Sequence, residues 1–250
     1  MRIVSLVPSV TETLIDFGLA DQLVGITRFC IHPANVVDDL PRVGGTKDPA
    51  LDKIRAAAPD IIFFNEEENR REDFEALAPT FRVHSGLIRT VAQVPDSLRQ
   101  IGQICGAASI AEQRACALEE ALADLDARCA GASFTFAYLI WRRPWMTLNS
   151  DTYVSDLLTR GGGRNVFADL PMRYPEITLD DLRARRPNVV LLPDEPFPFK
   201  TNHAEELAVT TGLHIDLISG DDACWHGVRA LRGVDLVGQL AQRYGYMKTV

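Results

Sequence analysis

The sequence predicts an α/β fold in which two Rossmann-like lobes, each built from βαβ units, are joined by one long backbone helix. Short apolar runs alternate with segments of helical period over the whole chain, which is typical of strands and helices around a mostly parallel sheet. The pattern of the first half recurs in the second, and a long helical segment separates the two. We therefore expect an N-terminal lobe over residues 1–106, a backbone helix over residues 107–130 and a C-terminal lobe over residues 131–250.

The first βαβ unit begins at the N-terminus, where residues 3–7 form an apolar run that stops at a proline and predicts a strand. Ser9 and Glu12 stand three residues apart in a capping-box pattern, in which each side chain satisfies a free backbone N–H at a helix start. We expect a helix over about residues 10–17 that ends at Gly18.

The rest of the first lobe continues the alternation. Asp48 is the expected N-cap, and Pro49 the first residue, of the helix between the second and third strands. Another helix begins at about Val94, with apolar side chains at helical spacing, and Gly106 closes it. Further strands are expected at residues 23–26, 61–65 and 81–84.

Residues 109–129 are rich in Ala, Glu, Leu and Asp, contain no Gly or Pro, and repeat apolar side chains at helical spacing. They predict one continuous helix. With a rise of about 1.5 Å per residue it would be roughly 30 Å long, close to the diameter of a small domain. We expect it to act as a rigid strut between the lobes.

The second lobe repeats the strand and helix signals. A helix over residues 152–160 ends in the glycine run 161–163, and because this run follows a helix and not a strand, it indicates helix termination and no phosphate loop. Asn202 and Glu205 predict the cap of another helix. Strands are expected at residues 134–141, 189–192 and 215–218, and a C-terminal helix is marked by Leu231, Val234, Leu240 and Tyr244.

The composition restricts the kinds of partner. The formal net charge is −8, and no run of Lys or Arg exceeds two residues, which argues against nucleic-acid binding and a basic membrane-binding patch. No apolar stretch approaches the roughly 20 residues that span a bilayer. The five cysteines have no CxxC spacing, so neither a disulfide framework nor a zinc site is expected. We expect a monomer whose partners are small molecules or proteins.

The N-terminus lacks the pattern of a secretory signal. Met1 and Arg2 lead directly into the first strand, without the apolar segment of roughly 7 to 15 residues and the cleavage site of a leader. As written, the sequence predicts a cytoplasmic protein. A start site further upstream that encodes an apolar leader would place it in the periplasm instead.

Signals for catalysis and metal binding are weak. The motifs GxSxG, HExxH, GxxxxGKS/T and GxGxxG are absent, so no catalytic residue is assigned, no enzyme is expected and no cofactor is required. His32, His84 and His226 show neither HxxxH nor HxH spacing, which favours ordinary hydrogen bonding over a direct metal site. For His226, beside Trp225, a second hypothesis is a role as lower axial group to a cobalt or iron centre.

A family resemblance depends on seven segments: RIVSLVPSVTETLIDFGLADQLVGIT at residues 2–27, HP at 32–33, PRVGGTKDPALDKI from Pro41, PDIIFF from Pro59, GGGRNVF from Gly161, YPEITLDDLRARRPNVVLL from Tyr174, and the stretch around residues 222–225. In their order and spacing they resemble the class III substrate-binding proteins of ABC importers, which carry vitamin B12, haem and iron-siderophores. The resemblance covers nearly the full length and looks nearest to the vitamin B12-binding branch.

The resemblance implies two Rossmann-like lobes bridged by one backbone helix, with the ligand held in the cleft by strand-to-helix loops of both lobes. It implies a ligand-binding protein that holds a corrinoid, or an iron chelate such as haem or a siderophore, and performs no covalent chemistry. Members of the family recognise their permease through one surface acid on each lobe, and Glu72 and Glu205 are the nearest candidates here.

Aromatic rings suit such a ligand because their flat faces bury a large apolar area at low entropy cost. By the motif match, Phe29 and Tyr174 fall where vitamin B12-binding members present aromatic side chains to the ligand. Trp145 and Trp225 lie in corresponding loops of the second lobe. Packing into the lobe edges is the alternative, and it fits Trp141 best because that residue directly continues a strand.

Polar residues complete the expected ligand-binding set. Thr46 and Asn65 stand where vitamin B12-binding members have tryptophans, so the first lobe is expected to be more polar. Lys47 either meets an acidic ligand group or is a solvated loop charge. Asp222 and His226 belong to the expected set as well.

Three consecutive glutamates at residues 66–68 follow a strand end, where they would attract a cation or an amine-bearing ligand; a solvated acidic loop is the other interpretation. Two alternatives to an importer-associated binding protein remain open. One is a cytoplasmic corrinoid sensor or chaperone, an intracellular relative of the family. The other is an enzyme that uses the same cleft, with Asp222, His226 and residues 66–68 as acid–base groups.

Overall fold

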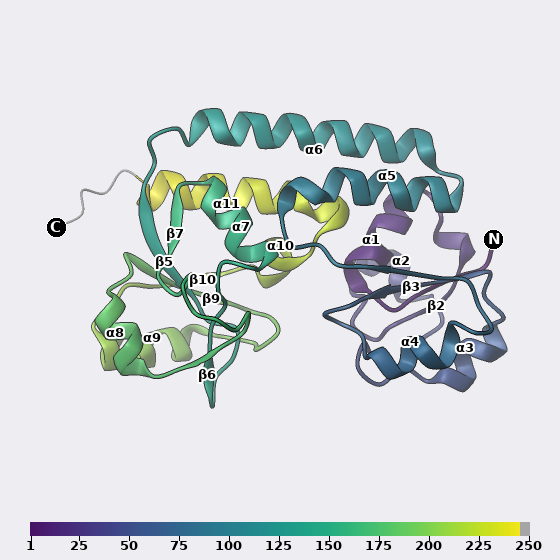
Figure 1. The fold of residues 1–250 in the computed structure, drawn as a ribbon, viewed down its shortest axis with the longest axis horizontal. Helices are drawn as coiled ribbons and strands as arrows, with labels where there is room; N and C mark the ends of the chain where they lie inside the picture. Colours follow the sequence, from purple (N-terminus) through teal and green to yellow (C-terminus); the bar gives the residue numbers. More distant parts are fainter. Residues whose placement is uncertain (246–250) are drawn as a thin grey trace. The chain divides into compact units, whose positions relative to one another are not determined.

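The computed structural model describes residues 1–245 and divides into two compact units. Unit 1 contains Met1–Ile88, Gln93–Ala117 and His226–Arg229. Unit 2 contains Arg89–Ala92, Leu118–Trp225 and the chain from Ala230 onward. Each unit is an α/β structure around a four-stranded parallel sheet, as the sequence predicts (Figure 1).

The sheet of unit 1 has the strand order β2-β1-β3-β4, and every neighbouring pair is parallel. Its strands are β1 (Ile3–Ser5), β2 (Leu23–Ile26), β3 (Ile61–Asn65) and β4 (Val83–Gly86). Its helices are α1 (Pro8–Asp16), α2 (Ala34–Val37), α3 (Leu51–Ala57), α4 (Arg71–Leu77) and α5 (Val94–Cys105), with 3-10 turns η1 (Ala20–Gln22) and η3 (Gly227–Arg229). Figure 1 shows α3 and α4 on one side of this sheet, and α1 and α5 on the other.

The core of unit 1 explains its sequence pattern. Strand β3 is buried along its whole length, so it reads as a continuous apolar run and not as an alternating one. Ile54 of α3 and Leu77 of α4 pack on one sheet face with Val4, Ile62 and Phe64. Because the strands are parallel, the loops that follow β1, β2 and β3 all leave the same edge of the sheet.

The sheet of unit 2 has the order β10-β9-β5-β7 and is also parallel throughout. Its strands are β5 (Phe134–Tyr138), β7 (Gly163–Asn165), β9 (Val189–Pro193) and β10 (Ile215–Ile218). The strands β6 (Trp145–Met146) and β8 (Glu176–Ile177) form a separate antiparallel ribbon. The helices are α7 (Tyr153–Arg160), α8 (Leu179–Arg185), α9 (Thr201–Thr211), α10 (Gly220–Cys224) and α11 (Ala230–Tyr244), and the 3-10 turn η2 (Val91–Gln93) precedes α5.

The core of unit 2 has the same construction. Leu182 of α8 and Leu207 of α9 pack against Val190 and Leu192 of β9. Tyr244 of α11 packs its ring beside a phenylalanine of β5, with the ring centroids of Phe134 and Tyr244 6.1 Å apart. Helices therefore cover the sheet on both faces.

One unbroken helix, α6 (Ala108–Arg128), fills the segment that the sequence predicts as a single helix. The division between the two units falls within it, after Ala117. Its buried side chains recur at helical spacing: Ala111, Ala115, Leu118, Leu122 and Leu125. Among the described residues, no helix is both long enough and apolar enough to cross a membrane. The role of α6 as a strut, and the lobe limits 1–106 and 131–250, stay predictions.

The capping box predicted at Ser9 and Glu12 is wrong. Helix α1 begins two residues earlier than predicted, at Pro8, whose missing N–H costs nothing in the first turn of a helix. Ser9 and Glu12 lie inside the helix and contact residues far away in the sequence: the Ser9 Oγ lies 3.5 Å from Nδ1 of His226, and Glu12 forms an ion pair with Arg229. Tertiary partners have replaced the local cap.

Two further predicted helix starts are also wrong. Helix α3 begins at Leu51, because Asp48 is taken up by a two-fold hydrogen bond with Arg28 and Pro49 bridges to Gly44. Helix α9 begins at Thr201, and the imidazole of His203 accepts the N–H of the N-cap residue Lys200. The predicted cap residues Asn202 and Glu205 are exposed within α9.

The strand predicted over residues 134–141 ends early, at Tyr138, where the hydroxyl of Thr147 donates to the Tyr138 carbonyl. The chain then turns through a bridge between Trp141 and Met146. Trp141 is 41% exposed, and its ring meets that of Phe197 edge to face, with the ring centroids 5.5 Å apart. The interpretation that Trp141 packs at the edge of its lobe agrees with the contact to Phe197, although the residue is not buried. Strand β4 likewise begins at Val83, two residues later than predicted.

Candidate functional site

Two asparagines organise the loops at the carboxyl edge of the unit 1 sheet. Asn69 accepts the backbone N–H of Asn65 at its Oδ1 (2.7 Å). Its Nδ2 donates to the carbonyls of Leu6 (3.1 Å) and Thr46 (3.0 Å). A single buried amide thus joins the chain after β1, the loop before α3 and the end of β3. Thr46 takes part through its backbone carbonyl.

Asn65 extends this network to a distant part of the chain. Its Oδ1 accepts the backbone N–H groups of Glu67 (2.8 Å) and Glu68 (3.2 Å), which fixes the orientation of the amide. The Nδ2 group then faces Nε2 of His226 at 3.3 Å as a donor. Because Nε2 accepts, the ring proton of a neutral His226 is on Nδ1, pointing at the hydroxyl of Ser9.

His226 is held neutral by its surroundings. Part of its surface is accessible, but protein packs closely around the ring, and this burial lowers the pKa of His226 to about 4. Both ring nitrogens have protein partners, Ser9 and Asn65. The geometry favours hydrogen bonding for His226 and does not support the axial-ligand hypothesis.

The residues after His226 are seated on α1. Arg229 forms a two-fold ion pair with Glu12, with Nε to Oε2 at 2.7 Å and Nη2 to Oε1 at 2.6 Å, and both side chains are largely buried. Gly227 has φ +80°, and a Cβ there would collide with the Thr13 hydroxyl. The N–H of Val228 donates to that same hydroxyl at 3.3 Å. The segment of residues 226–229 therefore has a specific place in unit 1.

Lys47 and Phe29 lie on neighbouring loops of unit 1. The Nζ of Lys47 donates to the carbonyl of Glu67 (2.6 Å), so this lysine supports the acidic loop of residues 66–68. Phe29 is 47% exposed, with the guanidinium of Arg28 4.8 Å from its ring centroid. Arg28 is held in turn by Asp48. Phe29 thus presents a flat ring to the surface on a fixed support.

A pocket of about 430 Å³ opens beside this network in unit 1. Its floor includes Phe64 and Phe74, which meet edge to face with their ring centroids 5.4 Å apart. Asn65, Asn69, Ser85 and four charged side chains, Glu66, Arg70, Arg71 and Glu75, complete the lining. This volume is in the range of small-molecule sites.

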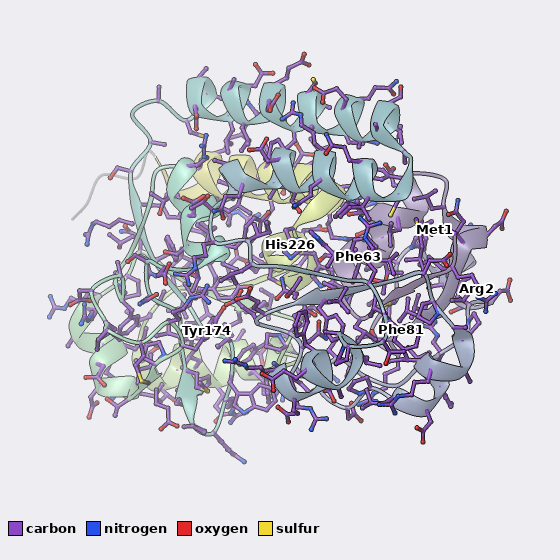
Figure 2. All side chains as sticks on the ribbon, turned by 45° about the vertical axis from the view of Figure 1, so that its right-hand side comes forward. Met1, Arg2, Phe63, Phe81, Tyr174 and His226 are labelled. Carbon is purple, nitrogen blue, oxygen red and sulfur yellow. The ribbon has the colours of Figure 1, made fainter. Side chains whose placement is uncertain are left out.

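In unit 2, Trp145 and Tyr174 have different surroundings. Trp145 is half-buried and stacks parallel to Phe199, with the ring centroids 6.2 Å apart. The guanidinium of Arg142 lies 5.8 Å from the ring of Trp145. Tyr174, labelled in Figure 2, is a residue of unit 2. It is 38% exposed, and the guanidinium of Arg173 lies 5.5 Å from its ring centroid. Of these two rings, Tyr174 is the more accessible to a ligand.

Trp225 and Asp222 belong to the carboxyl edge of the unit 2 sheet. Trp225 is only 6% exposed, and its Nε1–H donates to Oε1 of Glu195 at 2.5 Å. Asp222 lies in the first turn of α10, where its N–H donates to the capping hydroxyl of Ser219. Trp225 is therefore a buried, anchored ring in this structure and not an exposed platform.

Comparison with known proteins identifies the family. A family model described as periplasmic binding protein matches residues 3–209. The chain belongs to this family. A vitamin B12-binding protein of Vibrio cholerae is 24% identical over 191 residues, which cover 76% of this chain and 69% of the relative.

Solved structures share the fold. The periplasmic vitamin B12-binding protein BtuF of Vibrio cholerae has a TM-score of 0.82 at 22% identity, with 97% of this chain and 98% of that chain covered. A periplasmic heme-binding protein from Pseudomonas aeruginosa also has a TM-score of 0.82, at 21% identity, over 100% of this chain and 94% of that one. The two-lobed α/β fold expected for a class III substrate-binding protein is confirmed.

Membership of the periplasmic binding protein family decides between two of the functional classes left open by the sequence. The family consists of substrate-binding proteins, not enzymes. The alternative in which Asp222, His226 and residues 66–68 act as acid–base groups is therefore set aside. Within residues 1–245, moreover, no group of three or more His, Cys, Asp or Glu side chains is arranged to hold a metal ion.

The structure brings some of the expected site residues together. Asn65, His226, Lys47 and the backbone of Thr46 share one network in unit 1, whereas Phe29 lies apart from it on an exposed loop. In unit 2, Asp222 and Trp225 both belong to the region of α10, while Trp145 and Tyr174 lie on and beside the β6–β8 ribbon.

Sequence reasoning missed the residues that support these groups. They are Ser9, Glu12, Asn69, Glu195 and Arg229. Glu195 carried a usable signal, since an acid directly after the buried run of β9 lies at the carboxyl edge of the sheet. The pairing of Glu12 with Arg229 had none, because the two residues are 217 positions apart.

Proposed function

We propose that this protein binds a corrinoid, or else a haem-like or siderophore iron chelate, and delivers it to an ABC importer. The observation that carries the proposal is the family match over residues 3–209, together with relatives and structural neighbours named for vitamin B12 or heme. The exposed rings of Phe29 and Tyr174 support it, because flat apolar faces suit a macrocyclic ligand. No resident cofactor is needed for this role.

We propose that the members of the ligand-binding set act either by direct contact with the ligand or by fixing the loops around it. Phe29, Tyr174, Lys47 and Asp222 would meet the ligand directly, since each lies at least partly at the surface. Asn65, His226 and Trp225 would support the site indirectly, because they fix loops at the carboxyl edges of the two sheets. Trp145 and Thr46 complete the set.

Importer association would require a periplasmic location and a protein partner. The family description and the names of the solved structures support the periplasm for this chain as well. We propose Glu72 of α4 and Glu205 of α9 as the contacts with the permease, and a monomer as the active form. Both side chains are exposed, and Glu72 lies 3.4 Å from the guanidinium of Arg70.

Titration of the purified protein with cobalamin, cobinamide, haem and a ferric siderophore tests the proposal. Absorbance of the ligand and tryptophan emission would be followed together. We expect saturable binding of one ligand class, weakened roughly tenfold by Phe29→Ala or Tyr174→Ala because each removes a stacking face. Val209 lies on α9 and is 88% exposed. Val209→Ala is therefore the control, and this variant protein should bind the ligand normally. Absence of binding with all four ligands would overturn the proposal.

A further inference from the structure

The loop between β9 and α9 in unit 2 contains a partly buried acid, Glu195, that none of the expected ligand contacts includes. Glu195 lies just after β9, and its carboxyl group meets three residues of the α10 region: Asp221, Cys224 and Trp225. A buried carboxyl group is costly unless its hydrogen-bonding capacity is used. Its partners therefore indicate what it does.

Two donors converge on the same oxygen of Glu195. The indole Nε1–H of Trp225 donates to Oε1 at 2.5 Å, and the thiol of Cys224 donates to it at 3.2 Å. The indole N–H is the only polar group of a tryptophan side chain. Glu195 therefore fixes both the depth and the rotation of the Trp225 ring.

Two further contacts join the start of α10 to the residues that follow β9. The Asp194 carboxylate accepts the N–H of Gly220 at 2.6 Å, and Glu195 hydrogen-bonds with the side chain of Asp221. A Cβ at Gly220 would collide with the backbone of Glu195, so the two segments are in close contact. Movement of the Glu195 side chain would therefore displace the start of α10.

Several titratable and polar groups lie around Glu195. Asp221 and Cys224 face it from α10, Trp225 follows them, and Asp194 precedes it in the chain. From β5, the buried phenol of Tyr138 lies within reach of these charges, and burial raises its pKa well above the usual range. Burial first, and the charge of Asp221 second, raise the pKa of Glu195 to about 7.

We propose that Glu195 is a positioning residue that holds Trp225 and α10 in place and makes ligand binding depend on pH. The ligand part of this inference rests on the proposed binding function. The positioning part concerns the ligand-free protein alone.

Two arrangements follow from the contacts. Protonated Glu195 donates to the Asp221 carboxylate while its other oxygen accepts from Trp225 and Cys224, so that β9, α10 and the indole are joined. Ionised Glu195 keeps the two donors but is repelled by Asp221. The start of α10 then separates from β9, and the loop that carries Asp222 and Trp225 is less well organised for a ligand.

The ligand-free test uses Trp225 as the sole tryptophan, in a protein that carries Trp141→Phe and Trp145→Phe. Emission and near-ultraviolet circular dichroism are recorded from pH 5 to pH 9. We expect a transition of the Trp225 signal with a midpoint near the Glu195 pKa of about 7. Glu195→Gln should abolish this transition, because the amide keeps an acceptor for the indole and a donor for Asp221 at every pH. Glu176→Gln, at an exposed acid of the same unit, should leave it unchanged.

The ligand test compares affinity at pH 5.5 and pH 8.5, with whichever of cobalamin, cobinamide or haem binds. We expect binding to weaken about fivefold at the higher pH, at the lower end of usual coupling between linked sites. Glu195→Gln should bind tightly at both pH values, and Glu195→Ala weakly at both. If Glu195→Ala does not fold, the Glu195→Gln comparison still decides the outcome.

The possible failures are separable. A Trp225 transition without binding of any ligand would support the positioning role of Glu195 and refute the proposed function. Normal ligand binding with a flat Trp225 signal and no pH dependence would overturn the inference and leave the proposed function intact. A transition that survives in Glu195→Gln would assign the titration to another group and also overturn it.

Discussion

The amide nitrogen of Asn65 lies 3.3 Å from Nε2 of His226, and this contact joins the end of β3 to a residue 161 positions later in the chain. Asn65 also receives two backbone N–H groups from the acidic loop that follows β3. The same amide thus contacts both the histidine and the loop. The predictions below address this contact and the segment that carries it.

Replacement of Asn65 separates its two functions. Asn65→Asp keeps an oxygen for the N–H groups of Glu67 and Glu68 but cannot donate to His226, whereas Asn65→Ala loses both interactions. We expect hydrogen exchange at the amides of Glu67 and Glu68 to accelerate strongly in Asn65→Ala and little in Asn65→Asp. Equal protection in wild type and Asn65→Ala would show that the side chain does not hold the loop.

His226 should make the protein sensitive to acid. The pKa of His226, about 4, lies below the ordinary value near 6.5. As pH falls through this interval, His226 therefore becomes protonated in the unfolded chain but stays neutral in the folded protein. The free energy of unfolding contributed by His226 is therefore fully present above pH 6.5 and lost towards pH 4. We expect a loss of about 2 kcal/mol between pH 7 and pH 4.5.

Urea unfolding of wild type and His226→Gln at both pH values measures this effect. Glutamine does not titrate, so the pH-dependent loss should shrink by about the amount assigned to His226. An identical loss in both proteins would mean that other groups dominate the acid response.

Removal of one partner of the Arg229–Glu12 ion pair should strongly lower the stability of the protein. Their side chains are 4% and 15% exposed, so Arg229→Ala leaves a nearly buried carboxylate without its partner. We expect a destabilisation of about 3–5 kcal/mol. Removal of both charges, in Glu12→Gln with Arg229→Met, should restore most of this stability. Arg71→Ala breaks an exposed pair with Glu75 and serves as the control, with an expected effect below about 0.5 kcal/mol.

Gly227 and Gly18 form a matched pair of left-handed positions. Their φ angles are +80° and +78°, but a Cβ at Gly227 meets the Thr13 hydroxyl whereas a Cβ at Gly18 meets nothing within 4 Å. Gly18→Ala should therefore cost only the backbone strain, about 1 kcal/mol. Gly227→Ala should cost clearly more, because the segment after His226 must also move away from α1. Similar thermal midpoints for the two variants would contradict a tight fit of this segment.

The sheets were predictable from the sequence because their central strands are buried on both faces. Residues 61–64 and 189–192 show the continuous apolar runs that this burial requires, and both lie in strands in the structure. Helix ends were less predictable. Ser9 looked like a local cap, but its hydroxyl faces His226, a partner that no local pattern reveals.

The candidate site was predictable as a set of positions but not as a set of roles. Asn65, Lys47 and His226 were selected for ligand contact, and the structure joins them in one network with protein partners. Trp225 was expected at the surface, yet it is buried because Glu195 supplies an acceptor inside the protein for its N–H. The exposure of Trp141 depends on where β5 stops, which is decided by the hydroxyl of Thr147.

The placement of residues 226–229 has a consequence for dissecting this protein into fragments. The sheet of unit 1 is complete by Gly86, and a truncated chain of residues 1–117 contains all four of its strands. Such a fragment would lack residues 226–229, which supply the partners of Ser9, Glu12 and Thr13. The carboxylate of Glu12 would lose its ion pair with Arg229. Autonomous folding of the first half would require those residues to be grafted back, for example through a short linker after Ala117.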